Sequence, residues 1–458
     1  MRILFISHFF PPKYNAGTEK YTLSLAVGLQ SNGHEVEVLC AEDWEEGEHY
    51  WNGVTEDIYQ GVLVHRIHLN WLKASNPNKM LYDSPLIEEW TSQFLEGNDF
   101  DIVHITSVSS LGAGVLRSVK RAGIPLVLTL MDFWFICPSV QLLRSDGSLC
   151  DGITTAWECQ SCLMGGSNFY RRLEKASIPN QVLSHIFGPL ALITPVHKRR
   201  GFRGMLLEMN DRKSILGEAI ALPDKVISHS AVVKQMVSGV FSIPIEQIRN
   251  GYSKSWLVNY QKKPRVNEFR FGFIGQIIKI KGVHTLIEAF QKCQFDGKAR
   301  LDIWGDYTKH SGYTEMLQEL IGDNRSISLK GRFEHDQLAA ILSEIDVLVV
   351  PSLWYENAPL VIQESFAAQI PIIATNLGGM AESVTHNVNG LLFERGDVDD
   401  LANQMRRIAE EPDLLERLQM QIPPVKTIAE EVNELEAIYH EITNPGNEEY
   451  TISSSEAA

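Results

Sequence analysis

The alternation of short apolar runs with helical stretches is the feature that most limits how this chain can fold. Residues 2–7 (RILFIS) form an apolar run that ends at a turn, and residues 19–31 carry apolar side chains at helical spacing. Residues 34–41 return to a strand pattern. A strand, a glycine-containing loop, a helix and a second strand in this order are typical of the start of a doubly wound α/β domain.

The same alternation occurs twice along the chain. In the first half, further strand patterns lie at 101–106, 125–130 and 225–228, and helical patterns lie at 110–122 and from 230. In the second half, strand patterns lie at 269–274, 299–303, 326–329, 346–350 and 371–374, and helical patterns at 283–293, 313–321, 335–344 and 359–368. A chain of 458 residues is too long for one hydrophobic core. We therefore predict two similar α/β domains that join near residues 250–264.

The charge balance and the lack of long apolar stretches argue against several classes of protein. Acidic residues outnumber basic ones by 57 to 41, which gives a net charge of −16. A general nucleic-acid-binding protein needs a basic face, so this balance argues against one. The first apolar run is too short for a signal peptide, and no stretch reaches the roughly 20 apolar residues that span a bilayer. We expect a cytoplasmic protein, which could sit at the inner face of the membrane.

Two glutamates follow the predicted strand at 346–350. Glu356 lies in the loop after this strand, and Glu364 is expected about two turns into the next helix. Ligands of open α/β sheets bind outside the carboxyl ends of the strands, so both carboxylates can face one site. Carboxylates accept the paired hydrogen bonds of sugar and ribose hydroxyls. The free N–H groups near Pro359, at the start of that helix, suit a diphosphate.

At this point the sequence resembles the family-4 retaining glycosyltransferases. Glu356 and Glu364 are separated by seven residues, preceded by Pro-Ser and followed by a Gly-Gly pair that ends at Gly379, and then by Glu382. The resemblance covers nearly the whole chain, and its other motifs are Pro11-Pro12, Gly17-Thr18-Glu19, Gly33-His34-Glu35-Val36, Phe273-Ile-Gly-Gln276, Lys281-Gly282, Asn389-Gly390 and Gly396-Asp397. It implies an α/β protein of GT-B architecture, in which two Rossmann-like domains face each other across a cleft.

The resemblance also implies roles for the parts of the chain. Residues 1–255 would form an N-terminal acceptor-binding domain, and residues 265–420 would form the domain that binds the nucleotide sugar. Residues 163–215 interrupt the first domain as a helical insert. The helix at 423–442 would pack back across the domain boundary, and residues 444–458 would form a polar tail.

Site residues follow from the positions that match the family's motifs. Glu356 would contact the donor sugar, Lys281 would neutralise the leaving diphosphate, and Glu364 would hold the ribose. The full donor-binding set is Gly17, Gly275, Gln276, Lys281, Asn357, Ala358, Pro359, Leu360 and Glu364. Catalysis would need no metal, because basic residues and helix dipoles replace a divalent ion.

Two positions depart from the family's pattern. Gln276 stands where the family usually has arginine, and a neutral amide does not replace a planar cation, although Lys279 could compensate. Met131 stands where the family often has histidine, and methionine neither donates a hydrogen bond nor takes a proton. Asp132 is the candidate substitute and, with Glu356 and Lys281, completes the set of catalytic candidates.

Four of the six cysteines cluster, at Cys137, Cys150, Cys159 and Cys162. Four thiolates with one close pair suit a tetrahedral structural zinc, and four free thiols are the alternative.

A basic group consists of Lys198, Arg199, Arg200 and Arg203 and stands out on an acidic chain. It is either a solvated face or a surface for anionic lipid or a lipid-linked acceptor.

The sequence therefore predicts a retaining, metal-independent hexosyltransferase. It would transfer a sugar from a nucleotide-diphosphate sugar to a glycan or lipid-linked acceptor in cell-envelope polysaccharide synthesis. Met131 and Gln276 favour one alternative, an inactive subunit that binds sugar nucleotides. A sugar-nucleotide epimerase on the same architecture and a membrane-associated scaffold are two further alternatives. His8 and His104 lie at strand ends, where structural and catalytic histidines are both found.

Overall fold

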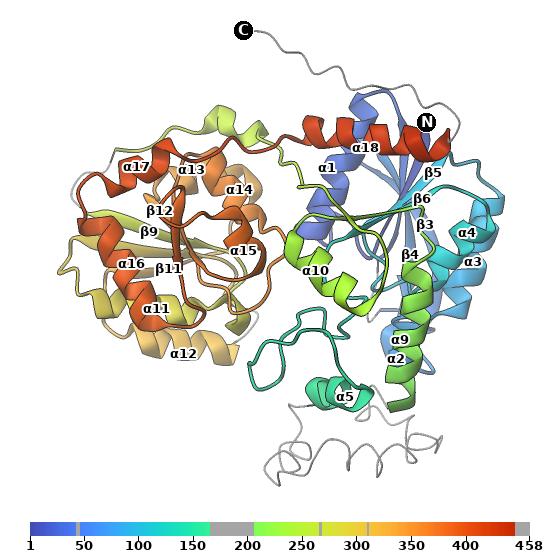
Figure 1. Cartoon of the computed structure of the whole chain (residues 1–458), viewed down its shortest axis with the longest axis horizontal. Coiled ribbons are helices and arrows are strands. Elements are labelled where there is room, and N and C mark those ends of the chain that lie inside the picture. Colours follow the sequence, from blue (N-terminus) through green and yellow to red (C-terminus); the bar gives the residue numbers. More distant parts are fainter. Residues whose placement is uncertain (43–45, 165–205, 265–267, 309–310, 445–458) are drawn as a thin grey trace.

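The computed structural model describes residues 1–42, 46–164, 206–264, 268–308 and 311–444. Its strands form two separate sheets, each covered by helices, and the two resulting domains lie side by side (Figure 1). This arrangement confirms the predicted α/β class with two Rossmann-like domains. None of the helices in these ranges is long and apolar enough to cross a membrane.

The first sheet has the strand order β3-β4-β2-β1-β5-β6-β7-β8. Every neighbouring pair is parallel except β3 and β4, which are antiparallel. Its strands are β1 Arg2–Ser7, β2 Glu35–Ala41, β3 Trp51–Tyr59, β4 Val62–Leu69, β5 Ile102–Ile105, β6 Leu126–Leu130, β7 Lys225–Ser228 and β8 Glu246–Gln247. Its helices are α1 Gly17–Ser31, η1 Trp71–Lys73, α2 Pro77–Met80, α3 Pro85–Glu96, α4 Gly114–Arg121, α5 Ala156–Met164, α9 Leu206–Ile220 and α10 Ala231–Val240.

The second sheet has the order β11-β10-β9-β12-β13-β14 and is parallel throughout. Its strands are β9 Phe269–Ile274, β10 Ala299–Trp304, β11 Ile327–Gly331, β12 Val347–Val350, β13 Ile372–Thr375 and β14 Gly390–Phe393. The remaining helices are η3 Ser255–Asn259, η4 Lys279–Lys281, α11 Val283–Cys293, α12 Ser311–Ile321, η5 His335–Gln337, α13 Leu338–Ser343, α14 Leu360–Ala367, α15 Gly378–Ser383, α16 Val398–Glu410, α17 Leu414–Met420 and α18 Ile428–Thr443.

Strand β1 shows why the first sheet needs helices on both faces. Ile3 and Phe5 belong to one buried cluster, which also contains residues of α1 and α18. Leu4 and Ile6 belong to another, which also contains residues of α3 and α4. Successive side chains of a strand point to opposite faces, so an apolar residue at every position requires an apolar cover on each side.

The antiparallel pair β3 and β4 has no counterpart among the sequence predictions. All nine residues of β3 are exposed or half-buried, and polar and apolar types are mixed along the strand, so it lacks a clear apolar alternation. The two strands are joined by Gln60 and Gly61, which both have positive φ, at 49° and 85°. A two-residue turn of this kind matches the twist of a hairpin.

Helix α18 returns from the second domain to the first, where it lies along α1 (Figure 1). The Tyr21 hydroxyl in α1 donates to Glu431 at 2.7 Å, and Gly28 packs against Val432. Tyr439 bonds to His104 of β5 at 2.6 Å. The last helix of the chain is therefore part of the first domain's helical layer.

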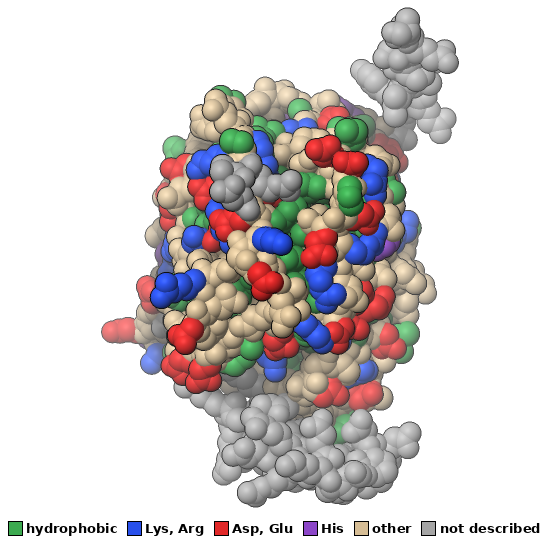
Figure 2. All heavy atoms as spheres, turned by 90° about the vertical axis from the view of Figure 1, so that its left-hand side faces the viewer, with side chains coloured by type: hydrophobic (Ala, Val, Ile, Leu, Met, Phe, Trp, Pro, Cys, Tyr) green, Lys and Arg blue, Asp and Glu red, His purple; other side chains and the backbone are tan. Residues whose placement is uncertain are grey.

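The outer face of the second domain carries no large patch of one charge. Figure 2 shows that acidic and basic side chains alternate across the described part of this face. Such a mixed surface is typical of a solvated face.

Candidate active site at the junction of the two domains

Glu356 lies in the loop after β12 and is buried, with 7% of its surface exposed. Its Oε1 atom accepts three hydrogen bonds, from Lys281 Nζ at 2.6 Å, Ser352 Oγ at 2.7 Å and Trp354 Nε1 at 2.8 Å. No described residue donates a hydrogen bond to Oε2. The structure thus brings Glu356 and Lys281 into direct contact and leaves one carboxylate oxygen for a ligand.

The Gly-Gly pair before Glu382 fixes the loop that carries Glu356. The Gly379 N–H group donates to the Glu356 carbonyl at 2.9 Å. A Cβ atom on Gly379 would lie 1.6 Å from the Asn357 carbonyl oxygen, so a side chain cannot fit. Position 379 therefore requires glycine, because the two backbone segments approach too closely there for a side chain.

Glu364 lies one turn into α14 rather than two, because the helix begins at Leu360. Its Oε1 atom accepts a hydrogen bond from the Tyr252 hydroxyl at 3.0 Å, and Trp256 Nε1 donates to that hydroxyl at 3.1 Å. Burial raises the pKa of Glu364, while the Tyr252 hydrogen bond and the charge of Lys20 oppose the rise. Lys20 belongs to α1, so its charge reaches this carboxylate from the other domain. The sequence predictions did not include Tyr252, Trp256 or Lys20.

Two helices, α14 of the second domain and α1 of the first, begin without a side-chain cap. No side chain caps α14, which begins after Ala358 and Pro359. No side chain caps α1 either, which begins at Gly17, and the space where a Gly17 side chain would lie is open. Free N–H groups at a helix N-terminus bind anions, so both helix starts suit phosphate oxygens.

Gln276 lies after β9, next to Gly275, and its side chain is exposed. The Gly275 N–H group donates to Trp304 at 3.1 Å, which continues the strand pairing. Lys279 is exposed and makes no ion pair with any described residue. Lys279 therefore places a positive charge three residues along the chain from Gln276. Its ammonium group is not planar, unlike the guanidinium of the arginine that the family usually has.

Met131 takes part in the site through its backbone. The Asn357 side-chain amide donates to the carbonyls of Met131 at 2.9 Å and Leu130 at 3.2 Å. Ser230 Oγ donates to Asn357 Oδ1 at 2.6 Å. Asn357 was predicted as a donor-binding residue, and its side chain joins the carboxyl ends of β6 and β7 to the second domain.

Glu382 makes a second connection between the domains. Its two carboxylate oxygens accept from the N–H groups of Ala231 and Val232, each at 2.7 Å. These two residues begin α10, so a carboxylate of the second domain caps a helix of the first. These two hydrogen bonds join the two domains at this point.

His8, Glu19 and Asp132 form a polar group at the carboxyl edge of the first sheet, which we call the first-domain polar group. His8 Nε2 lies 3.3 Å from Glu19 Oε1. His8 Nδ1 and Glu19 Oε2 are buried atoms that have no hydrogen-bond partner among the described residues. Buried polar atoms are nearly always bonded, so this pair marks a place where a ligand can bind. Glu19 appeared in the sequence analysis only as part of a motif.

The electrostatics of this group favour a charged Glu19. Burial acts to raise its pKa, but the hydrogen bond and charge of His8 outweigh burial, and the pKa is lowered. Burial raises the pKa of Asp132, whose Oδ1 accepts from the Trp134 N–H at 2.7 Å, while the charges of His8 and Arg212 oppose the rise. Asp132 is therefore within electrostatic range of His8.

His104, in contrast, has a structural role. It is fully buried, and its two ring nitrogens bond to Tyr439 at 2.6 Å and Thr129 at 2.7 Å. Burial lowers its pKa to about 3, so the ring is neutral at physiological pH.

The four clustered cysteines line one small cavity between the segment after β6 and α5. All are free thiols, and burial raises the pKa of Cys150, Cys159 and Cys162. Among the described residues, no group of three or more His, Cys, Asp or Glu side chains is arranged to hold a metal ion. Structural zinc stays a prediction, which metal analysis of the purified protein tests. Lys198, Arg199, Arg200 and Arg203 lie outside the described residues.

The fold and the site define a protein of the GT-B class. Residues 16–150 match the family model described as Glycosyltransferase Family 4, and residues 259–422 match that of Glycosyl transferases group 1. Over 426 residues the chain is 27% identical to an uncharacterized glycosyltransferase, MJ1607, of Methanocaldococcus jannaschii, with 89% of both chains covered. It is 30% identical over 197 residues to MJ1178 of the same organism, which covers 43% of this chain and 52% of that protein. The chain is a glycosyltransferase of the GT-B type, related to family 4.

Solved structures agree on the fold. Sucrose-phosphate synthase from Thermosynechococcus elongatus superposes with a TM-score of 0.65 at 14% identity and covers 97% of this chain and 100% of its own. Anabaena HepE, solved with UDP and glucose, gives a TM-score of 0.60 at 17% identity, with 96% and 98% covered. At these identities the likeness concerns the fold alone.

Proposed function

We propose that this glycosyltransferase transfers a sugar from a nucleoside diphosphate sugar with retention of the anomeric configuration and without a metal. The observation that carries the proposal is the pair of buried carboxylates, Glu356 and Glu364, each with one oxygen bonded by the protein and the other available. A carboxylate held in this way can accept a bond from a ligand hydroxyl without a large change in its own position.

Each group of the second domain then has a defined task. Glu364 accepts hydrogen bonds from the ribose hydroxyls, and Glu356 accepts one from the donor sugar. Lys281 has three N–H bonds, one of which goes to Glu356. Its remaining N–H groups, with the uncapped starts of α14 and α1, stabilise the negative charge of the leaving diphosphate. These fixed positive groups take the place of a divalent ion.

The first-domain polar group faces the acceptor in this proposal. His8 Nδ1, held through Nε2 by Glu19, orients the acceptor hydroxyl. The bond from the sugar C1 to the diphosphate oxygen breaks, the bond from C1 to the acceptor oxygen forms on the same face, and the acceptor proton passes to the leaving phosphate. The acceptor is a glycan or a lipid-linked sugar, as expected for an enzyme of polysaccharide synthesis. A match to CapM, a capsular polysaccharide glycosyltransferase of Staphylococcus aureus, at 25% identity over 154 residues supports this setting.

A thermal-shift screen of nucleoside diphosphates and their sugars tests donor binding. One base should raise the melting temperature of the wild type, and Glu364→Ala should remove the shift. If the variant binds as well as the wild type, the assignment of the ribose to Glu364 is wrong.

Turnover separates the enzyme from its alternatives. Release of nucleoside diphosphate that depends on both donor and acceptor supports the transferase. Tight donor binding without turnover, in the presence of cell-derived acceptor lipids, supports the inactive subunit, which Met131 and Gln276 favour. Interconversion of the sugar on the intact nucleotide supports the epimerase.

A further inference from the structure

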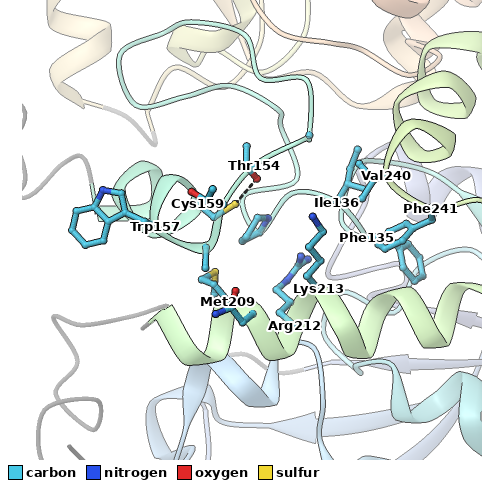
Figure 3. Close-up of a pocket in the computed structure, with 15 residues that line it drawn as sticks. Phe135, Ile136, Thr154, Trp157, Cys159, Met209, Arg212, Lys213, Val240 and Phe241 are labelled. Carbon is cyan, nitrogen blue, oxygen red and sulfur yellow. Dashed lines mark hydrogen bonds between the residues drawn. The ribbon is translucent and has the colours of Figure 1, made fainter. Parts of the chain in front are cut away.

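A cavity of about 360 Å³ lies in the first domain, next to the segment that carries Asp132. Its walls come from four elements, namely residues 135–138, the start of α5, one turn of α9 and the end of α10 (Figure 3). Its volume is in the range of pockets that hold small ligands. Phe135, Trp157, Met209, Val240 and Phe241 supply its apolar part.

Two neighbouring cations of α9 point into this cavity. Figure 3 shows Arg212 and Lys213 rising from α9 toward Thr154. Arg212 is 6% exposed, donates a hydrogen bond to the Trp134 carbonyl and lies over the Trp134 ring, 5.4 Å from its centre. Burial lowers the pKa of Arg212 to about 10, so the guanidinium is still charged at neutral pH.

Neither cation has a carboxylate partner. No ion pair joins Arg212 or Lys213 to any described residue, although the charge of Asp132 acts on Arg212 from a greater distance. A buried charge with no counter-ion in contact costs free energy, which a bound anion recovers. None of the described residues that line the cavity is acidic, although the chain has 57 acidic residues.

The cavity also offers neutral donors. Thr154 and Thr155 line it, and α5 begins beside them at Ala156. Hydroxyl groups and the first N–H groups of a helix both donate to phosphate oxygens. Cations, hydroxyls and an apolar wall therefore meet in one cavity.

We propose that this cavity binds a phosphate or diphosphate group of the acceptor, with Arg212 and Lys213 as its principal ligands. The inference rests on the proposed transfer to an acceptor, and it narrows the acceptor to a phosphorylated one. Arg212 bonds to the Trp134 carbonyl, and the Trp134 N–H bonds to Asp132. A phosphate on Arg212 would thus be fixed relative to the first-domain polar group, where the acceptor hydroxyl is expected.

Titration calorimetry with inorganic pyrophosphate tests this site. The donor site is first saturated with the nucleoside diphosphate that gives the largest thermal shift, so that only the second site is measured. Wild type should bind pyrophosphate, and Arg212→Gln should weaken binding about tenfold or more, since it removes a charge-assisted bond. Lys213→Met should weaken binding less, and Arg212→Lys should restore part of the affinity.

Matched controls come from the second domain. Arg325→Gln and Lys298→Met change exposed residues outside the cavity and should leave the affinity unchanged. Because Lys213 is exposed, Lys213→Met keeps the test valid if Arg212→Gln does not fold. Competition by a hexose phosphate would identify a water-soluble acceptor, and competition by farnesyl diphosphate would identify a lipid-linked one.

Two results would overturn the proposal. One is a wild type that binds no pyrophosphate once the donor site is filled, and the other is binding that neither variant changes. If metal analysis finds zinc in the purified protein, and Arg212→Gln releases it while pyrophosphate affinity stays intact, Arg212 serves the cysteine cluster instead. The donor-dependent thermal shift and its loss in Glu364→Ala are measured separately, so they can stand while this site fails.

Discussion

The site has two halves, a proposed donor half in the second domain and a proposed acceptor half in the first, and they differ in how they are assembled. In the second domain, Glu356 and Glu364 come from one loop and the helix that follows it, and local contacts such as Ser352 and Trp354 hold the first of them. In the first domain, His8, Glu19 and Asp132 come from separate elements that meet only at the edge of the sheet. Short-range contacts therefore fix part of the donor half, although Lys281 and Tyr252 reach it from distant positions in the sequence. The first-domain polar group depends on the packing of the domain throughout.

The two halves also differ in charge. Burial raises the pKa of Glu364, while His8 lowers that of Glu19. The donor half therefore has a buried carboxylate that can accept hydrogen bonds from hydroxyl groups. The acceptor half has the contact between His8 and Glu19, and each of these two residues has one atom without a hydrogen bond to the described residues. If this contrast reflects function, substitutions in the second-domain half should affect use of the donor, and substitutions in the first-domain half should affect use of the acceptor.

The largest effect is expected from Glu356→Gln. This change removes the charge that Lys281 contacts and weakens the hold on the donor sugar, so kcat should fall by about 100-fold to 1,000-fold. The thermal shift with nucleoside diphosphate should remain, because Glu364 holds the ribose. A kcat close to that of the wild type would contradict the assigned role of Glu356.

Glu431 should make the stability of the first domain depend on pH. It accepts bonds from Tyr21 and the Gly251 N–H, and burial raises its pKa to about 7, against 4.5 as its ordinary value. Between these two pH values the folded state keeps a proton that the unfolded state has lost. The free energy of unfolding should therefore fall as pH rises from 4.5 to 7, by at most about 3 kcal/mol.

Chemical denaturation at pH 5 and pH 8 measures this effect. Glu431→Gln should reduce the difference between the two pH values, because the amide mimics the protonated carboxyl. Glu441→Gln, on the same helix but near its exposed end, is the matched control. An unchanged pH difference in Glu431→Gln would show that Glu431 does not titrate in this range.

His8→Ala should affect the acceptor step alone. Removal of the ring should lower kcat/KM for the acceptor about 10-fold to 100-fold, since it removes the group that orients the hydroxyl. Donor binding in the thermal-shift assay should be unchanged. Glu19→Gln should have a smaller effect in the same direction, and a loss of donor binding in either variant would contradict the separation of the two halves.

The smallest effect is expected from Glu382→Ala, which removes the cap on α10 from across the junction. Loss of an N-terminal cap costs about 1 kcal/mol, and differential scanning calorimetry should detect it as a lower melting temperature. Ser383→Ala is a neighbouring control, whose hydroxyl bonds only within its own helix, to Gly379. Equal melting temperatures for wild type and Glu382→Ala would mean that this contact does not hold the domains together.

The sequence determined the class of fold, and its family resemblance supplied the candidates for the donor half of the site. The alternation of short apolar runs, which are bounded by turn residues, with longer stretches of helical spacing predicts two doubly wound domains. Glu356, Glu364 and the Gly-Gly pair lie close together in sequence, and with the motifs in the rest of the chain they carry the resemblance that implies a nucleotide-sugar site. The sequence also marked Met131 and Gln276 as departures from the family's pattern.

Only the tertiary structure decided how distant residues meet. Tyr252 reaches Glu364, the Asn357 side chain reaches the carbonyl of Met131, and the charge of Lys20 acts on the opposite domain. Nothing in the local pattern around these residues encodes such contacts, because they form when two separately folded sheets pack together. The cavity around Arg212 arises in the same way, from four elements whose side chains become neighbours only after folding.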